Sequence, residues 1–122
     1  MAGILIIEDD PYVRRFYDRL FHLNGYDVEL AEGGREGLEK AKEMKPSLIL
    51  LDIMMPNMDG FQVLEKLKSD PETKDISVVM LTNLGSSEST KKAVQLGASG
   101  FIIKSDTPPE ELLRMVDGFV PK

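Results

Sequence analysis

Side chains that could perform chemistry stand directly after apolar segments at several places in this sequence. They are Glu8 and Asp9 after residues 4–7, Asp52 after residues 48–51, Thr82 after residues 76–81, and Lys104 after residues 101–103. Carboxylates are hard oxygen ligands that suit Mg²⁺, and an aspartate can also attack phosphorus to form an aspartyl phosphate. A lysine ammonium and a threonine hydroxyl supply the positive charge and the hydrogen-bond donor that a phosphoryl group needs. These residue types therefore suit Mg²⁺-dependent phosphoryl transfer to a carboxylate.

The elements that must position these side chains alternate regularly. Short apolar segments, typical of strands buried on both faces, alternate with segments whose apolar residues recur at helical spacing. The expected strands cover residues 4–7, 26–31, 48–51, 76–81 and 101–103, and the expected helices lie within residues 11–23, 37–44, 58–69, 86–96 and 107–119. This order predicts an α/β fold, with a parallel sheet between helices on both faces. Residues 26–31 alternate apolar and polar side chains, which predicts a strand at the edge of the sheet.

The parallel sheet would bring these distant side chains together. The carboxyl ends of parallel strands lie along one edge, where open α/β sheets bind their ligands. Three carboxylates that meet there repel one another unless a cation neutralises them, and we expect this cation to be Mg²⁺. Each residue alone has an ordinary explanation. Asp52 or Thr82 could cap a helix, Lys104 could be a surface charge, and residues 8–10 could form a solvated acidic turn whose last residue is a helix cap. Their coincidence at one edge favours a common function.

The composition limits the class of protein. The chain has 122 residues, which suits one domain over residues 1–122. A net charge of -6 argues against direct binding to nucleic acid or to an anionic membrane, because both require a basic surface. The absence of cysteine and the single histidine, His22, exclude disulfides, thiol catalysis and a metal site built from His or Cys. No apolar run approaches the roughly 20 residues of a membrane-spanning helix, and no signal peptide is predicted, so we expect a cytoplasmic protein.

Four segments carry a resemblance to a known family. They are Ile4-Leu5-Ile6-Ile7-Glu8-Asp9-Asp10, Leu51-Asp52-Ile53-Met54-Met55-Pro56-Asn57-Met58-Asp59-Gly60, Leu81-Thr82 and Phe101-Ile102-Ile103-Lys104. Together they resemble the receiver domains of two-component response regulators, and the resemblance spans essentially the whole chain. It implies a flavodoxin-like (βα)5 fold whose five parallel strands have the order 2-1-3-4-5.

The resemblance also implies a role for individual residues. In the metal site, Asp9 would bind Mg²⁺ directly, Glu8 through water, Asp52 through its carboxylate and Met54 through its backbone carbonyl. At the phosphoryl group, Asp52 would be the acceptor, Thr82 and Lys104 would bind the phosphoryl oxygens, and Phe101 would be the switch aromatic. Phe101 is expected to turn inward as Thr82 moves toward the phosphate, although it could equally be an ordinary core aromatic. The fourth helix, fifth strand and fifth helix would form the surface that signals the change.

Three positions depart from the family pattern. Ser105 follows Lys104 where many receivers have a cis proline, and we expect a trans peptide because a cis bond before serine costs roughly 2.5–4 kcal/mol. Asn83 is bulkier than the small residue typical after the threonine, which would narrow the access to the phosphoryl acceptor. Met54 and Leu84 are apolar where receivers often carry polar residues that place the hydrolytic water. We therefore expect slow self-dephosphorylation.

These observations predict a stand-alone receiver that takes its phosphoryl group from a sensor histidine kinase or a histidine phosphotransfer protein. It would not be an enzyme beyond its own Mg²⁺-dependent phosphorylation and dephosphorylation, and it would act as a monomer or weak dimer on an unknown protein target. The chain could also be a fragment of a larger regulator. An aspartate-nucleophile phosphatase or phosphotransferase is a weaker alternative, since such enzymes usually carry a second acid where this chain has Met54. A pseudo-receiver or flavin-binding domain is a third alternative, disfavoured by the intact set of acids, threonine and lysine.

Overall fold

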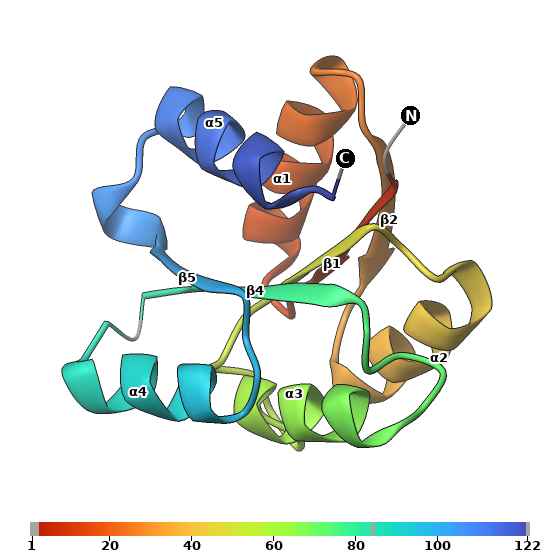
Figure 1. The fold of residues 1–122 in the computed structure, drawn as a ribbon. Coiled ribbons are helices and arrows are strands. Elements are labelled where there is room, and N and C mark those ends of the chain that lie inside the picture. Colours follow the sequence, from red (N-terminus) through yellow and green to blue (C-terminus); the bar gives the residue numbers. More distant parts are fainter. Residues whose placement is uncertain (1–2, 84, 122) are drawn as a thin grey trace.

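The computed structural model describes residues 3–83 and 85–121, in which strands and helices alternate along the chain (Figure 1). The strands are β1 (Gly3–Ile7), β2 (Asp27–Ala31), β3 (Leu48–Leu51), β4 (Ser77–Thr82) and β5 (Gly100–Ile103). The helices are α1 (Pro11–Leu23), α2 (Gly34–Met44), α3 (Gly60–Ser69), α4 (Ser87–Gln95) and α5 (Pro109–Phe119), and a 3-10 turn, η1 (Lys104–Asp106), follows β5. The predicted alternation of strands and helices is confirmed.

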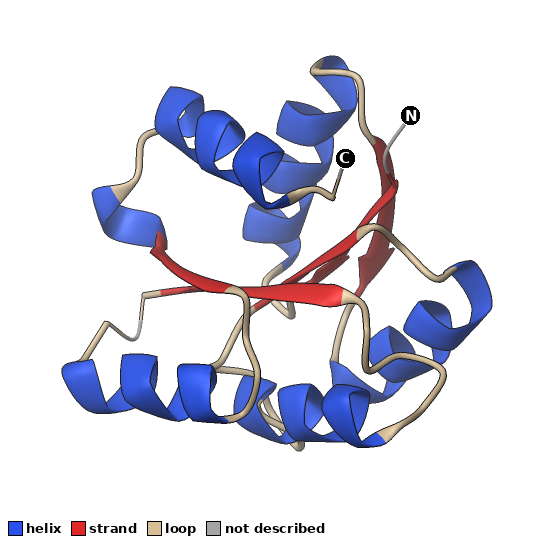
Figure 2. Cartoon of the chain, viewed as in Figure 1, coloured by secondary structure: helices blue, strands red, loops and turns tan. Residues whose placement is uncertain are grey.

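All neighbouring strands pair in parallel, in the order β2-β1-β3-β4-β5. The flavodoxin-like fold is thus confirmed, and β2 lies at an edge, as its alternating sequence predicted. Helices cover both faces of the central sheet, as Figure 2 shows. Buried residues of α1 and α5 pack on one face, and buried residues of α2, α3 and α4 pack on the other. None of the described helices is both long enough and apolar enough to span a membrane.

The register of the sheet sets which side chains meet at its carboxyl edge. Ile7 pairs with Leu51, so the acids that follow β1 and β3 leave the sheet side by side. Thr82 pairs with Ile103, so the residue after β5, Lys104, lies one step beyond the end of β4. The predicted convergence of the strand ends therefore results directly from the strand order and the register.

Two acids close to the predicted site in the sequence, Asp10 and Asp59, cap helices. The Asp10 carboxylate caps α1 and accepts hydrogen bonds from the backbone N–H groups of Tyr12, at 2.9 Å, and Val13, at 3.2 Å. Asp59 caps α3 in a capping box with Gln62. Because α3 has its own cap, Asp52 is not needed as one, and the helix-cap explanation of Asp52 is wrong.

Two element boundaries differ from the sequence prediction. The second helix begins at Gly34 instead of residue 37, and its first residue lies close to α3. A Cβ atom at Gly34 would lie 2.7 Å from Val63 Cγ2, so packing against α3 favours glycine at this position. The fourth strand extends through Thr82. Thr82 is therefore the last residue of β4 and not a helix cap.

Candidate functional site

Three carboxylates converge at the carboxyl edge of the sheet, from the ends of β1 and β3. One oxygen each from Glu8, Asp9 and Asp52 lies within 4.8 Å of the other two. Glu8 and Asp52 are buried, and Asp9 is half-buried. Buried carboxylates at this spacing repel one another, and their hard oxygen atoms are the ligands that Mg²⁺ prefers. The residues present therefore fit a divalent metal ion of the Mg²⁺ type.

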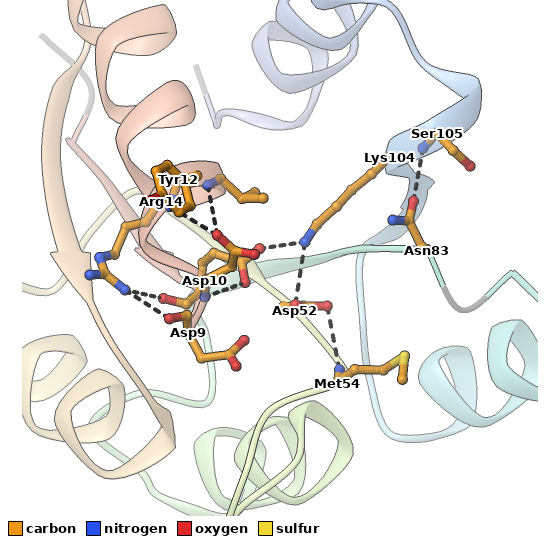
Figure 3. A network of polar contacts seen from close by, with 11 residues as sticks. Asp9, Asp10, Tyr12, Arg14, Asp52, Met54, Asn83, Lys104 and Ser105 are labelled. Carbon is orange, nitrogen blue, oxygen red and sulfur yellow. Dashed lines mark hydrogen bonds and ion pairs between the residues drawn. The ribbon is translucent and has the colours of Figure 1, made fainter.

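Lys104 reaches into this cluster from the opposite side (Figure 3). Its Nζ atom donates to Glu8 Oε1 and lies 3.3 Å from Asp52 Oδ2. All three side chains are largely buried, with 13%, 3% and 9% of their surface exposed. In the absence of a metal ion, the lysine ammonium compensates part of the negative charge of the two carboxylates.

Backbone N–H groups orient the remaining carboxylate oxygens. The Asp10 N–H donates to Glu8 Oε2 at 3.1 Å, and the Met54 N–H donates to Asp52 Oδ1 at 3.4 Å. Gly60 is required close by, because a side chain at this position would overlap the Asp52 carbonyl group. The Met54 backbone thus lies beside Asp52, whereas the Met54 side chain is exposed.

Burial raises the pKa of Glu8 from its ordinary value of 4.5 to about 7. The hydrogen bond from Lys104 opposes this rise of the pKa, and the charge of Asp52 adds to it. Glu8 therefore binds a proton in the folded, metal-free protein at pH values where the unfolded chain has already released it.

This difference predicts a pH-dependent stability of the metal-free protein. Because the folded-state pKa is the higher one, the stabilisation from Glu8 is complete below pH 4.5 and is lost as the pH rises to about 7. The free energy of unfolding should fall by up to about 3 kcal/mol over this interval, as measured by urea denaturation in the presence of a chelator. The Glu8→Gln variant should lack this part of the pH dependence. An identical slope in both proteins would contradict the prediction.

Thr82 is the last residue of β4, and Phe101 lies within β5, where the sequence predicted a strand. Thr82 is fully buried at the end of β4, next to the strand from which Lys104 emerges. Phe101 pairs with Met80 in the sheet and packs, half-buried, against the core beneath α2, α3 and α4. The exchange of Phe101 between two positions remains a prediction.

Asn83 and Ser105 join the two loops that follow β4 and β5. The Ser105 N–H donates to Asn83 Oδ1 at 2.9 Å (Figure 3). A proline after Lys104 would lack this donor, and the Lys104–Ser105 peptide is trans, as expected. The Asn83 amide thus contacts the loop after β5, and a narrowed access to Asp52 remains a prediction. Leu84 lies outside the described residues.

The sequence analysis did not identify Arg14, which contacts the backbone of the acidic turn. Its Nη1 atom donates to the carbonyl oxygens of Glu8, at 2.9 Å, and Asp9, at 3.2 Å. The only signal in the sequence is an arginine four residues after the helix cap Asp10, and an arginine at such a position is usually a surface charge.

The family model of the response regulator receiver domain matches residues 4–117, and this range contains the acids, Thr82 and Lys104. The chain belongs to the response regulator receiver domain family. Receiver domains are signalling domains and not classical enzymes, and they bind Mg²⁺ at an acidic pocket. In this receiver domain, the acidic pocket corresponds to the cluster of Glu8, Asp9 and Asp52.

Related proteins and structures agree with this membership. The receiver is 38% identical to the DNA-binding dual master transcriptional regulator RpaA of Synechocystis over 115 residues, which make up 94% of this chain and 48% of RpaA. The chemotaxis protein CheY4 of Vibrio cholerae has a TM-score of 0.91 and 31% identity, with 98% of each chain covered. The Mn²⁺-bound form of response regulator Rcp1 has a TM-score of 0.80 and 26% identity, with 97% of this chain and 91% of Rcp1 covered. The receiver spans about half, or less, of the length of the curated relatives it matches.

Proposed function

We propose that this receiver accepts a phosphoryl group on Asp52 from a phosphohistidine of a sensor histidine kinase or a histidine phosphotransfer protein. One observation carries the proposal: at the ligand-binding edge of the sheet, a buried aspartate lies 3.3 Å from a buried lysine ammonium and within 4.8 Å of two further carboxylates. A carboxylate nucleophile, a cation for the phosphoryl group and ligands for a metal ion are the parts that phosphoryl transfer requires.

In the transfer step, an Asp52 carboxylate oxygen attacks phosphorus and forms the new P–O bond. The P–N bond of the donor breaks, and its electron pair stays on the imidazole nitrogen. The other ring nitrogen of the donor carries a proton, so the imidazole leaves as a neutral group. Bound Mg²⁺ supplies positive charge for the carboxylates and for the phosphoryl oxygens. Glu8, Asp9, Asp52 and the Met54 carbonyl would hold this ion, with Glu8 acting through water.

Phosphorylation would then change the surface of the receiver. The Lys104 ammonium, which contacts Glu8 and Asp52 in this structure, would pair with the phosphoryl oxygens, and the Thr82 hydroxyl would donate to them. We propose that the movement of Thr82 draws Phe101 inward and changes the face formed by α4, β5 and α5, to which a downstream protein binds. The reading frame beyond residue 122 distinguishes a stand-alone receiver from part of a larger regulator.

The experiment that tests this function uses the purified chain, MgCl₂ and acetyl phosphate. Intact-mass spectrometry should show the gain of one phosphoryl group, and peptide mapping should place it on Asp52. The gain should disappear when a chelator replaces MgCl₂, and hydroxylamine, which cleaves acyl phosphates, should reverse it. A phosphoryl group on serine or threonine, or none at all, would refute the proposed function.

The phosphorylated receiver should lose its phosphoryl group slowly. The Met54 side chain is exposed beside Asp52 and, being apolar, cannot orient or deprotonate a water molecule. A Met54→Glu variant offers a base at this position, and we expect its first-order dephosphorylation to be about tenfold faster, as followed by intact mass after removal of the donor. The Met54→Leu variant is the matched control and should decay like the wild type. Equal dephosphorylation rates for Met54→Glu and the wild type would refute the hypothesis that Met54 keeps dephosphorylation slow.

A further inference from the structure

The Arg14 side chain connects the acidic turn after β1 with the loop after β2. One guanidinium nitrogen, Nη1, donates to the carbonyl oxygens of both Glu8 and Asp9, at 2.9 and 3.2 Å. The other, Nη2, donates to Glu32 Oε1 at 3.1 Å. The Arg14 side chain is only 15% exposed, so it is packed in place and does not behave as a freely moving surface charge.

The hydrogen bonds from Arg14 matter more for the position of Asp9 than for that of Glu8. The Glu8 carboxylate is held from two sides, by Lys104 and by the Asp10 N–H. Within residues 3–83 and 85–121, by contrast, the hydrogen bond from Arg14 to the Asp9 carbonyl is the single one in which Asp9 takes part. The Asp9 carboxylate therefore depends on its own backbone for its position, and Arg14 holds that backbone.

We propose that Arg14 is a positioning residue for the divalent metal ion. By binding both carbonyl oxygens, it turns them toward the loop after β2 and keeps the Asp9 carboxylate within ligand distance of Glu8 and Asp52. Groups that orient metal ligands in this way typically contribute about 10- to 100-fold to metal affinity. This inference rests on the metal-binding part of the proposed function.

The positive charge of Arg14 acts in the opposite direction. A guanidinium close to the acidic cluster repels a divalent cation, so removal of the charge alone would strengthen Mg²⁺ binding. For a substitution of Arg14 by an uncharged residue, the loss of positioning predicts weaker Mg²⁺ binding, whereas the loss of repulsion predicts tighter Mg²⁺ binding. The sign of the change in Mg²⁺ affinity therefore decides between positioning and simple electrostatics.

The experiment measures the dissociation constant of Mg²⁺, by titrating MgCl₂ into ¹⁵N-labelled protein and following the backbone amide shifts. We expect Arg14→Met to bind Mg²⁺ about 10-fold more weakly, and Arg14→Lys about threefold more weakly, because lysine keeps the charge but lacks the planar fork. At saturating MgCl₂, phosphorylation of Arg14→Met by acetyl phosphate should regain the wild-type rate. Arg15→Met is the matched control, since Arg15 is the exposed neighbour on the same helix, and its Mg²⁺ affinity should equal that of the wild type.

The outcomes separate this inference from the proposed function. Wild-type protein that binds Mg²⁺ and is phosphorylated on Asp52, together with unchanged or tighter Mg²⁺ binding by Arg14→Met, would overturn the inference alone. Wild-type protein that binds no Mg²⁺ would overturn the proposed function itself. Urea denaturation of the metal-free variants checks that they are folded, and Arg14→Lys provides the test if Arg14→Met is not.

Discussion

The Asp52→Asn variant should take up no phosphoryl group from acetyl phosphate in the presence of MgCl₂. The amide of asparagine is not a nucleophile toward phosphorus, whereas the carboxylate is. Neither neighbouring acid is expected to replace Asp52, because Glu8 pairs with Lys104 and Asp9 is proposed to bind the metal ion. We therefore expect phosphoryl incorporation below the detection limit of intact-mass spectrometry.

This variant should remain folded. Removing the charge of Asp52 removes a repulsion that raises the pKa of Glu8, so the metal-free variant should be at least as stable as the wild type near pH 7. Asp59→Asn is the matched control, because asparagine is as good a helix cap as aspartate and the α3 cap should be retained. Full phosphorylation of Asp59→Asn is expected. Continued incorporation by Asp52→Asn would show that another residue is the acceptor.

Replacement of Lys104 by methionine should have opposite effects on metal binding and on phosphoryl transfer. The variant leaves two buried carboxylates, of Glu8 and Asp52, without the cation that contacts both. Breaking a buried ion pair typically costs about 3–5 kcal/mol. Proton uptake by Glu8, whose pKa is no longer lowered by Lys104 in the variant, should reduce this loss. Because a competing positive charge is gone, the affinity for Mg²⁺ should rise roughly tenfold. Phosphorylation should nevertheless slow by about 100-fold, since the variant loses the charge that we propose stabilises the phosphoryl oxygens.

Three measurements test this prediction. Urea denaturation without metal gives the stability, titration with MgCl₂ gives the Mg²⁺ affinity, and incubation with acetyl phosphate gives the rate of phosphorylation. The loss of stability should shrink toward pH 6, where Glu8 is protonated in the folded variant. Lys66→Met, at an exposed position of α3, should match the wild type in all three measurements. Weaker Mg²⁺ binding by Lys104→Met would show that the lysine supports the metal site instead of competing with it.

The sequence predicted the fold because the required signals are local. Short apolar runs bounded by turn residues, such as Leu48–Leu51, are typical of buried strands. Their regular alternation with segments of helical periodicity favours a parallel sheet. The strand order 2-1-3-4-5 came from the family resemblance, and the structure confirms it. Boundaries were less predictable. α2 begins at Gly34, where an added Cβ would overlap Val63 on α3, and no local pattern encodes this proximity.

The amino-acid sequence by itself determined which side chains stand at the ends of the strands, since a strand end is marked by the change from apolar to polar residues. The tertiary structure alone decided what each of these side chains contacts. The pairing of Lys104 with Glu8 and Asp52, the bond between Asn83 and Ser105, and the hold of Arg14 on the acidic turn all join separate segments. Such contacts depend on strand register and side-chain direction, which the whole fold sets and no short segment of sequence specifies.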